Sequence, residues 1–260
     1  MDSVTEQPVT SVSVLRVRVD GLALDGLIDS VSRMAASTTK RQVAYANIHV
    51  LNVAWSDHEL RQVLNEADVV YCDGYGVVLG ARLLGYRLPG RMTGADWIYP
   101  FCARCASAGI TIYLLGSAPG VAARAAARLR ALYPELRIVG VHHGYLHDTP
   151  NECAAAIADV NAARPDILLV GMGTPLQEKW IAAHRAELNV PVCWSVGALF
   201  DYVAGVVPRA PHWMLDNGLE WLYRLYLEPR RLGYRYLIGN PLFFWRILRQ
   251  RLAGKWRQND

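Results

Sequence analysis

Short apolar runs and longer amphipathic segments alternate along most of the chain. Runs typical of strands occupy residues 12–19, 42–46, 69–72, 110–115, 137–141, 166–170 and 191–196. Segments with apolar residues at helical spacing occupy residues 22–34, 50–55, 58–64, 77–84, 96–107, 121–132, 151–163 and 176–186. Strands that alternate with helices of these lengths favour a mainly parallel sheet with right-handed crossovers. We therefore predict an α/β fold with a Rossmann-like sheet flanked by helices.

The pattern changes after Asp201. Between residues 207 and 257, ten cationic side chains face three acidic ones and are interleaved with aromatic residues, and a helical pattern follows Pro241. We expect a Rossmann-like domain over residues 1–206 and a basic, aromatic helical appendage over residues 207–260.

With 260 residues, 52% of them hydrophobic and 19% charged, the chain is long enough to bury a full core. No apolar stretch reaches about 18 residues, which argues against a membrane-spanning helix. The first residues are acidic and polar, which argues against a secretory signal. The five scattered cysteines are then typical of reduced thiols in a cytoplasmic protein. Cys102 and Cys105 form a C-x-x-C pair without a second pair, and we interpret them as structural rather than as a metal or redox site.

One carboxylate, Asp73, directly follows a buried apolar run and begins the turn Asp73-Gly-Tyr-Gly76. The carboxyl ends of strands are where open α/β sheets bind their ligands. Gly74 permits a tight turn and the close approach of a ligand. Asp73 is therefore either a ligand-binding or catalytic carboxylate, or a cap of the following helix.

Three further strand-to-helix junctions are rich in glycine or small residues, and each offers backbone N–H groups to phosphate oxygens. None of them is a complete G-x-G-x-x-G motif, and no P-loop motif is present. Together they favour a nucleotide or diphosphate ligand over plain packing. Their candidate binding residues are Gly116, Gly171, Gly173, Gly197, Phe200 and Asp201.

Gln177 and Glu178 follow the second of these junctions, near the start of an expected helix. An amide there can bind sugar hydroxyls or a uracil edge, because it both donates and accepts hydrogen bonds. Glu178 either joins it or complements the helix dipole.

The helix expected after Pro241 can place apolar side chains on one face and arginines on the other. Such a basic amphipathic helix suits an anionic membrane surface. The alternatives are a helix packed on its own core, and contact with nucleic acid, for which no motif is present. The membrane-facing or diphosphate-binding candidates in the appendage are Arg209, Arg224, Arg230, Arg231 and Arg235.

The order of several motifs resembles the WecG/TagA/CpsF glycosyltransferase family over nearly all of residues 12–245. The matching positions are Asn47, Asp73-Gly-Tyr-Gly-Val-Val78, Arg91-Met-Thr-Gly-Ala-Asp96, Tyr113-Leu-Leu-Gly116, His143-Gly-Tyr145, Pro165-Asp-Ile-Leu-Leu-Val-Gly-Met-Gly-Thr-Pro-Leu-Gln-Glu178, Val196-Gly-Ala-Leu-Phe-Asp201, Arg209-Ala-Pro211 and Gly218-Leu-Glu-Trp-Leu-Tyr-Arg-Leu225. Together these motifs are highly specific, although no single one is.

The resemblance implies a bacterial inverting glycosyltransferase. Members of the family move a sugar from a UDP-sugar to a polyprenyl-diphosphate-linked saccharide at the cytoplasmic face of the plasma membrane, for teichoic acid, common antigen or exopolysaccharide. It implies that Asp73 is the general base, that Arg91 and Gln177 are active-site residues together with Asn47, and that the appendage closes over the site and contacts the membrane.

No D-x-D pair is placed to hold a metal on the diphosphate, so we expect a metal-independent transfer without a cofactor. Arg91, Arg209 and the appendage arginines are then the candidates to offset the charge of the departing diphosphate.

Two positions depart from the family pattern. Tyr45 stands where many members have threonine, and Leu176 stands where lysine is common. A phenol near the sugar leaves the donor open between UDP-N-acetylmannosamine and a UDP-hexose such as UDP-glucose.

Several alternatives remain open. His49 and His143 either line the site or are structural, and Asp201 either binds the nucleotide or caps a helix. From other classes, an inactive nucleotide-sugar-binding scaffold and a dehydrogenase-like protein share this fold, although the latter lacks its dinucleotide motif. A homo-oligomer whose state is linked to membrane contact is also consistent with the sequence.

Overall fold

The computed structural model describes residues 11–146, 150–216 and 218–257. The start of the chain, on which the absence of a secretory signal was predicted, lies outside these ranges. The described chain forms one eight-stranded sheet in the order β1-β2-β4-β3-β8-β7-β5-β6. The strands are β1 (Ser11–Val14), β2 (Val17–Asp20), β3 (Arg41–Ala46), β4 (Val69–Cys72), β5 (Thr111–Gly116), β6 (Arg137–His142), β7 (Ile167–Gly171) and β8 (Val192–Ser195).

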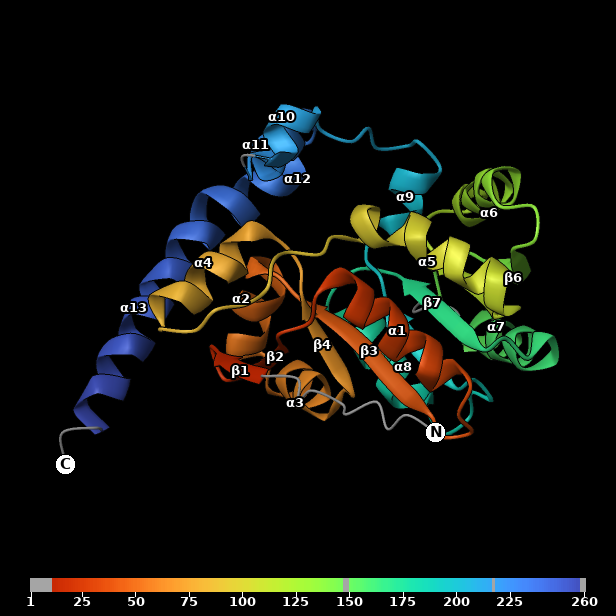
Figure 1. Ribbon diagram of the computed structural model, residues 1–260, viewed down its shortest axis with the longest axis horizontal. Helices are drawn as coiled ribbons and strands as arrows, with labels where there is room; N and C mark the ends of the chain where they lie inside the picture. The colour runs from red at the N-terminus through yellow and green to blue at the C-terminus, as the bar shows by residue number, and fades with distance from the viewer. Residues whose placement is uncertain (1–10, 147–149, 217, 258–260) are drawn as a thin grey trace, which may run out of the picture.

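All neighbouring strands pair in parallel except β1 and β2. Figure 1 shows α1 and α5 in front of the sheet and α8 behind it, so helices cover both faces. The helices of this core are α1 (Leu24–Ala35), α2 (Ile48–Ser56), α3 (His58–Glu66), α4 (Tyr75–Leu83), α5 (Gly94–Ala108), α6 (Val121–Leu132), α7 (Pro150–Ala163), α8 (Leu176–His184) and α9 (Leu199–Val203). The predicted α/β fold with a Rossmann-like parallel sheet is confirmed.

The strand β7 shows why the apolar runs are continuous rather than alternating. Ile167 and Leu169 belong to the main core cluster, while Leu168 and Val170 belong to a second cluster on the opposite face with residues of α7 and α8. Successive side chains point to opposite faces, and both faces are covered, so every position is apolar.

The single strand predicted over residues 12–19 is wrong. The segment is an antiparallel hairpin, in which β1 and β2 pair through Val14 and Val17. Leu15 and Arg16 form the turn with positive φ angles of 50° and 68°. Because the turn contains neither glycine nor proline, the usual sequence signal for a turn is missing.

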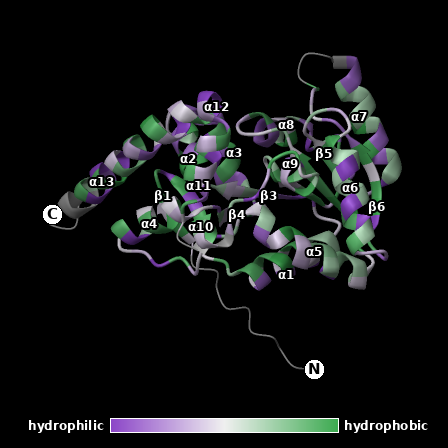
Figure 2. Ribbon diagram, turned by 90° about the horizontal axis from the view of Figure 1, so that it is seen from above, coloured by the Kyte–Doolittle hydropathy of each residue, from purple (hydrophilic) through white to green (hydrophobic). Residues whose placement is uncertain are grey.

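After residue 206 the chain forms α10 (His212–Asp216), α11 (Glu220–Leu227), α12 (Pro229–Gly233), the π-helix η1 (Tyr234–Ile238) and α13 (Gly239–Arg257). Figure 1 shows α13 as a long helix beside α4 and α2 that projects beyond the sheet. Figure 2 shows hydrophilic and hydrophobic residues interspersed along it. None of the helices in the described ranges combines the length and the hydrophobicity needed to cross a bilayer.

The core-facing side of α13 is formed by Phe243 and Ile247, which are fully buried in the main cluster. Leu248 and Leu252, which the pattern places on one apolar face, are 49% and 59% exposed. The helix therefore packs on the core through one set of apolar residues and leaves another set uncovered.

The domain boundary at residue 206 stays a prediction.

Gly80 in α4 permits the close approach of α13. A Cβ at this position would lie 2.7 Å from the ring of Phe243, whereas a Cβ at Gly26 in α1 would meet only an ordinary contact at 3.7 Å. We expect Gly80→Ala to lower the free energy of unfolding by about 1–3 kcal/mol through overpacking. Gly26→Ala, the matched control, should leave stability unchanged or raise it by about 0.5–1 kcal/mol. Chemical denaturation measures both, and equal stabilities would argue against this packing of α13.

Candidate active site

A cavity of about 900 Å³ lies between the strand ends of the core and the appendage. Its floor comes from residues that follow β3, β4 and β8, and its roof comes from α11, η1 and α13. The predicted site residues that line it are Tyr45, Asn47, Asp73, Gly74, Arg91, Gly173, Gly197, Arg224, Arg231 and Arg235.

The strand register places Asn47 beside Asp73. Ala46 of β3 pairs with Cys72 of β4, so the next residue of each strand leaves the sheet at the same edge. The amide of Asn47 donates a hydrogen bond of 3.0 Å to Asp73 Oδ2. The other end of the same amide accepts the backbone N–H of Val50 and caps α2. Asn47 thus fixes the carboxylate of Asp73 relative to a rigid helix.

The carboxylate of Asp73 does not cap a helix, because the cap of α4 is Gly74, with a φ angle of 98°. Burial raises the pKa of Asp73 to about 6, and the negative charge of Glu220 adds to this rise. The hydrogen bond from Asn47 and the charges of Arg235 and Arg224 oppose it. A carboxylate with this pKa is charged at neutral pH and is a stronger proton acceptor than an exposed aspartate.

Arg91 lies in the loop just before α5. Thr93 is the N-cap of this helix and Asp96 is its third residue, so the two form a capping box. The helix thus begins at Gly94, two residues before the segment predicted over residues 96–107. Asp96 Oδ2 accepts Arg91 Nη1 at 3.1 Å and the Thr93 hydroxyl at 2.8 Å. This box holds the guanidinium of Arg91 at the cavity wall.

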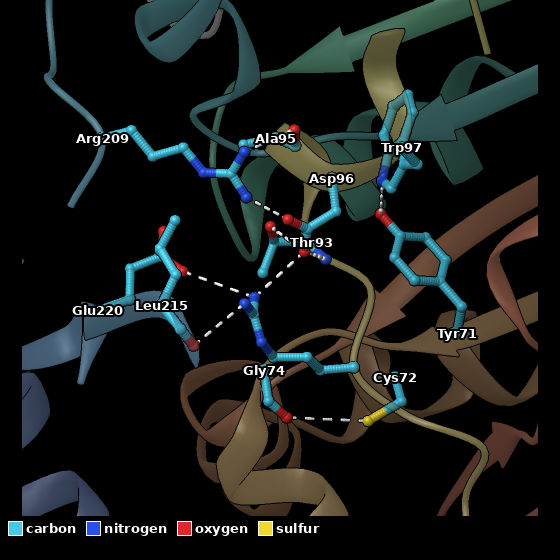
Figure 3. A network of polar contacts seen from close by, with 11 residues as sticks. Tyr71, Cys72, Gly74, Thr93, Ala95, Asp96, Trp97, Arg209, Leu215 and Glu220 are labelled. Atoms are coloured by element: carbon cyan, nitrogen blue, oxygen red, sulfur yellow. Dashed lines mark hydrogen bonds and ion pairs between the residues drawn. The ribbon is translucent and has the colours of Figure 1, made fainter. Parts of the chain in front are cut away.

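The first part of the appendage is anchored on the same box (Figure 3). Arg209 donates to the carboxylate of Asp96 and, at 3.2 Å, to the carbonyl of Ala95. Arg91 Nη2 lies 3.4 Å from the carbonyl of Leu215, and Arg91 Nη1 lies 3.7 Å from Glu220 Oε2. Arg209 therefore serves the docking of the appendage and does not line the cavity.

Cationic donors in the roof lack partners. The Nε atoms of Arg224 and Arg235 are buried and have no hydrogen-bond acceptor among the described residues, and the same holds for the hydroxyl of Tyr202. Arg224 lies over the Tyr202 ring at 5.4 Å. His49 also lines the cavity, where burial and the nearby Arg235 lower its pKa to about 4. Buried, unsatisfied cationic donors are suited to an anionic ligand.

The direct ligand contact predicted for Gln177 and Glu178 does not fit their position, because both side chains are fully buried behind the cavity wall. Gln177 Oε1 accepts the backbone N–H groups of Gly197 at 2.9 Å and Gly173 at 3.3 Å. Its amide donates to Tyr45 at 3.3 Å and to Glu178 at 2.6 Å. These two residues hold three parts of the cavity wall in place.

The remaining predicted residues lie outside the cavity lining. Gly116 allows β5 to approach β7, because a Cβ there would lie 2.4 Å from the carbonyl oxygen of Gly171. Phe200 is 1% exposed and packs beneath Gly171, so it belongs to the core. Asp201 lies within α9 and accepts the Ser117 hydroxyl at 3.0 Å, so it is not a helix cap. Arg230 is exposed.

Sequence reasoning missed Thr174, Tyr202 and Glu220, which also line the cavity. Thr174 and Glu220 fall within motifs that carry the family resemblance, which was the available signal for them. His143 pairs with Glu152 at 2.8 Å outside the cavity. With His142 they form a group whose ligand atoms lie within 4.8 Å of one another, a spacing compatible with a metal ion.

The sequence model of the glycosyl transferase WecG/TagA/CpsF family matches residues 12–257. Similar relatives include the N-acetylglucosaminyldiphosphoundecaprenol N-acetyl-beta-D-mannosaminyltransferases of Staphylococcus aureus strains NCTC 8325 / PS 47 and COL. Each is 28% identical over 239 residues, which cover 91% of this chain and 91% of the relative. The chain therefore belongs to the WecG/TagA/CpsF family of glycosyl transferases.

Proposed function

We propose that the protein transfers a hexose or an N-acetylhexosamine from a UDP-sugar to a polyprenyl-diphosphate-linked saccharide, with inversion at the anomeric carbon. The observation that carries this proposal is one cavity that holds a half-buried carboxylate, Asp73, opposite unpartnered arginine donors. The names of the Staphylococcus aureus relatives describe transfer to a diphosphoundecaprenol-linked N-acetylglucosamine, which supports the same acceptor class here.

Asp73 is the general base of this reaction. It takes the proton of the acceptor hydroxyl while that oxygen forms its bond to the anomeric carbon. The bond between this carbon and the diphosphate oxygen breaks on the opposite face, so the configuration inverts and UDP leaves. A raised pKa suits this role, because the carboxylate must be charged before the transfer and must hold a proton after it.

The arginines stabilise the leaving group. Charge accumulates on the diphosphate as its bond to the sugar breaks, and fixed cations at that position lower the barrier. Arg224 and Arg235 have buried Nε donors available for phosphate oxygens, and Arg91 and Arg231 line the same cavity. These four residues supply the positive charge without a metal ion.

Tyr45 restricts the space beside Gly197, where the donor sugar is expected. Its hydroxyl oxygen lies only 2.7 Å from the position of a Cβ at Gly197. Its ring takes space that a smaller side chain would leave free, so both a UDP-hexose and UDP-N-acetylmannosamine belong in the test of the donor.

The appendage provides a surface for a lipid-linked acceptor. Several large side chains of η1 and α13 are more than half exposed, among them Tyr234, Leu237, Trp245 and Leu252. Arginines lie between them in the sequence, so the surface combines apolar and cationic groups. We propose peripheral contact with an anionic membrane on the cytoplasmic side, in the biosynthesis of a cell-envelope polysaccharide.

Release of UDP by the purified protein tests the reaction. The protein is given a panel of UDP-sugars and a short-chain polyprenyl-diphosphate saccharide, with and without EDTA. We expect one donor to yield acceptor-dependent UDP that survives EDTA. Binding of UDP without turnover of any donor would favour a nucleotide-sugar-binding scaffold instead.

The variant Asp73→Asn removes the proton acceptor and keeps the shape of the side chain. We expect kcat to fall by about 10²–10⁴-fold, the usual contribution of a general base. Binding of UDP, measured by calorimetry, should change little, and thermal stability should not fall, because a desolvated charge is lost. Asp25→Asn, at an exposed position of α1, is the matched control. Turnover by Asp73→Asn equal to that of the control would contradict the role of Asp73.

The pH dependence of kcat/KM reports the same group. Because the pKa of Asp73 is raised to about 6, the carboxylate is charged above this pH and protonated below it. Activity should therefore be constant above the pKa and fall tenfold per pH unit on acidification below it. The Asn47 amide stabilises the charged form, so Asn47→Ser should move this limb to higher pH. A limb near the ordinary aspartate pKa would count against the assignment.

A further inference from the structure

Glu220 has no role in the chemistry above, yet its carboxylate lies inside the cavity. It is the first residue of α11, and its side chain is 19% exposed. Its Oε2 lies 3.7 Å from Arg91 Nη1, and its charge raises the pKa of Asp73. An acid at this position weakens the electrostatic attraction of the cavity for a diphosphate, so its presence requires an explanation.

The contact of Glu220 with Arg91 is weaker than the other contacts that dock the appendage. At 3.7 Å it is an ion pair without a hydrogen bond, whereas Arg91 is hydrogen-bonded to Asp96 at 3.1 Å. Arg209 separately joins the appendage to Asp96 and to the carbonyl of Ala95. Docking therefore does not depend on Glu220, and its pair with Arg91 can break while these contacts persist.

A guanidinium binds carboxylate and phosphate oxygens through the same N–H donors. A carboxylate at Arg91 therefore occupies the position that a phosphate oxygen of the donor would take. We propose that Glu220 pairs with Arg91 at the place of the donor's diphosphate and gives way when the nucleotide binds. This inference rests on the proposed function, because it takes the diphosphate of a UDP-sugar as the ligand.

Release of Glu220 also affects a second cation. Arg224 lies one turn further along α11 than Glu220, and its Nε is buried without an acceptor. Because both residues belong to one helix, a shift of α11 that separates Glu220 from Arg91 also moves Arg224 relative to the floor. Glu220 is thus a positioning residue that links binding of the nucleotide to the position of the appendage.

The affinity for UDP, measured by calorimetry on the full chain, tests this inference. Glu220→Gln keeps the size of the side chain and removes its charge, so UDP should bind about threefold to tenfold more tightly, as expected for one partly exposed charge. Glu135→Gln, which removes one exposed acid outside the cavity, is the matched control and should leave the affinity unchanged.

Glu220→Gln combined with Arg91→Met tests whether Arg91 is the residue with which Glu220 pairs. If Glu220 competes for Arg91, the gain from Glu220→Gln should fall below about twofold when Arg91 is absent. Unchanged or weaker binding of UDP by the single variant would overturn the inference, and weaker binding with lower thermal stability would assign Glu220 to docking alone. Failure of the wild-type protein to bind UDP would overturn the proposed function and the inference with it.

The pH profile gives a readout that a docking role would not produce. The charged groups that act on Asp73 are Glu220 and Arg224 from α11 and Arg235 from η1. The other charged and titratable side chains of the cavity include Arg91, Arg231, His49, Tyr45, Tyr71 and Tyr202. Glu220→Gln removes the only acid of this set, so the acidic limb of kcat/KM should move to lower pH. A limb that stays in place would show that Glu220 does not act on the floor of the cavity.

Discussion

The desolvation of one carboxylate is the constraint on which the candidate active site depends. Asp73 directly follows the carboxyl end of the parallel strand β4, and burial makes its charge less stable than in water. One hydrogen bond from Asn47 and the positive charges of the arginines in the roof stabilise the charged form of Asp73. Without these groups the pKa of the carboxylate would be higher still, and a smaller fraction of it would be charged at neutral pH. The floor and the roof are therefore one electrostatic unit, although they are far apart in the sequence.

The last helix of the appendage, α13, is held by contacts with the β1–β2 hairpin and with α2. Gln250 of α13 accepts the backbone N–H of Leu15 at 2.9 Å and donates to the carbonyl of Ser13 at 3.0 Å. The ring of Trp55 has the guanidinium groups of Arg16 and Arg246 at 5.0 and 5.2 Å from its centre. The hairpin β1–β2, which the pattern alone did not reveal, thus contributes to the position of the helix that ends the roof.

Most of the sheet could be predicted from the sequence because its strands are buried on both faces. The bounds of β4 and α6 agree with the predicted runs, since each is limited by turn residues. The hairpin at Leu15 was missed because strained φ angles were adopted without glycine. In the site, the expectation that ligands bind at the carboxyl ends of strands correctly placed Asp73 in the cavity. It failed for Gln177, whose side chain is buried and does not line the cavity. The burial of a single polar side chain such as Gln177 cannot be read from the local pattern. The contact of Glu220 with Arg91 could not be predicted either, because the two residues are far apart in the sequence.

The two parts of the cavity are synthesised at different times, because they lie in different parts of the sequence. Its floor is complete once β8 and the following turn exist, whereas the cations of its roof belong to the last helices of the chain. During synthesis a nascent chain can build the sheet and expose Asp73 before Arg224 and Arg235 have left the ribosome. In such an intermediate the carboxylate faces water and lacks the arginines that face it in the complete fold. Under the proposed function, completion of the last helices is therefore also the step at which the cavity acquires the cations for its nucleotide.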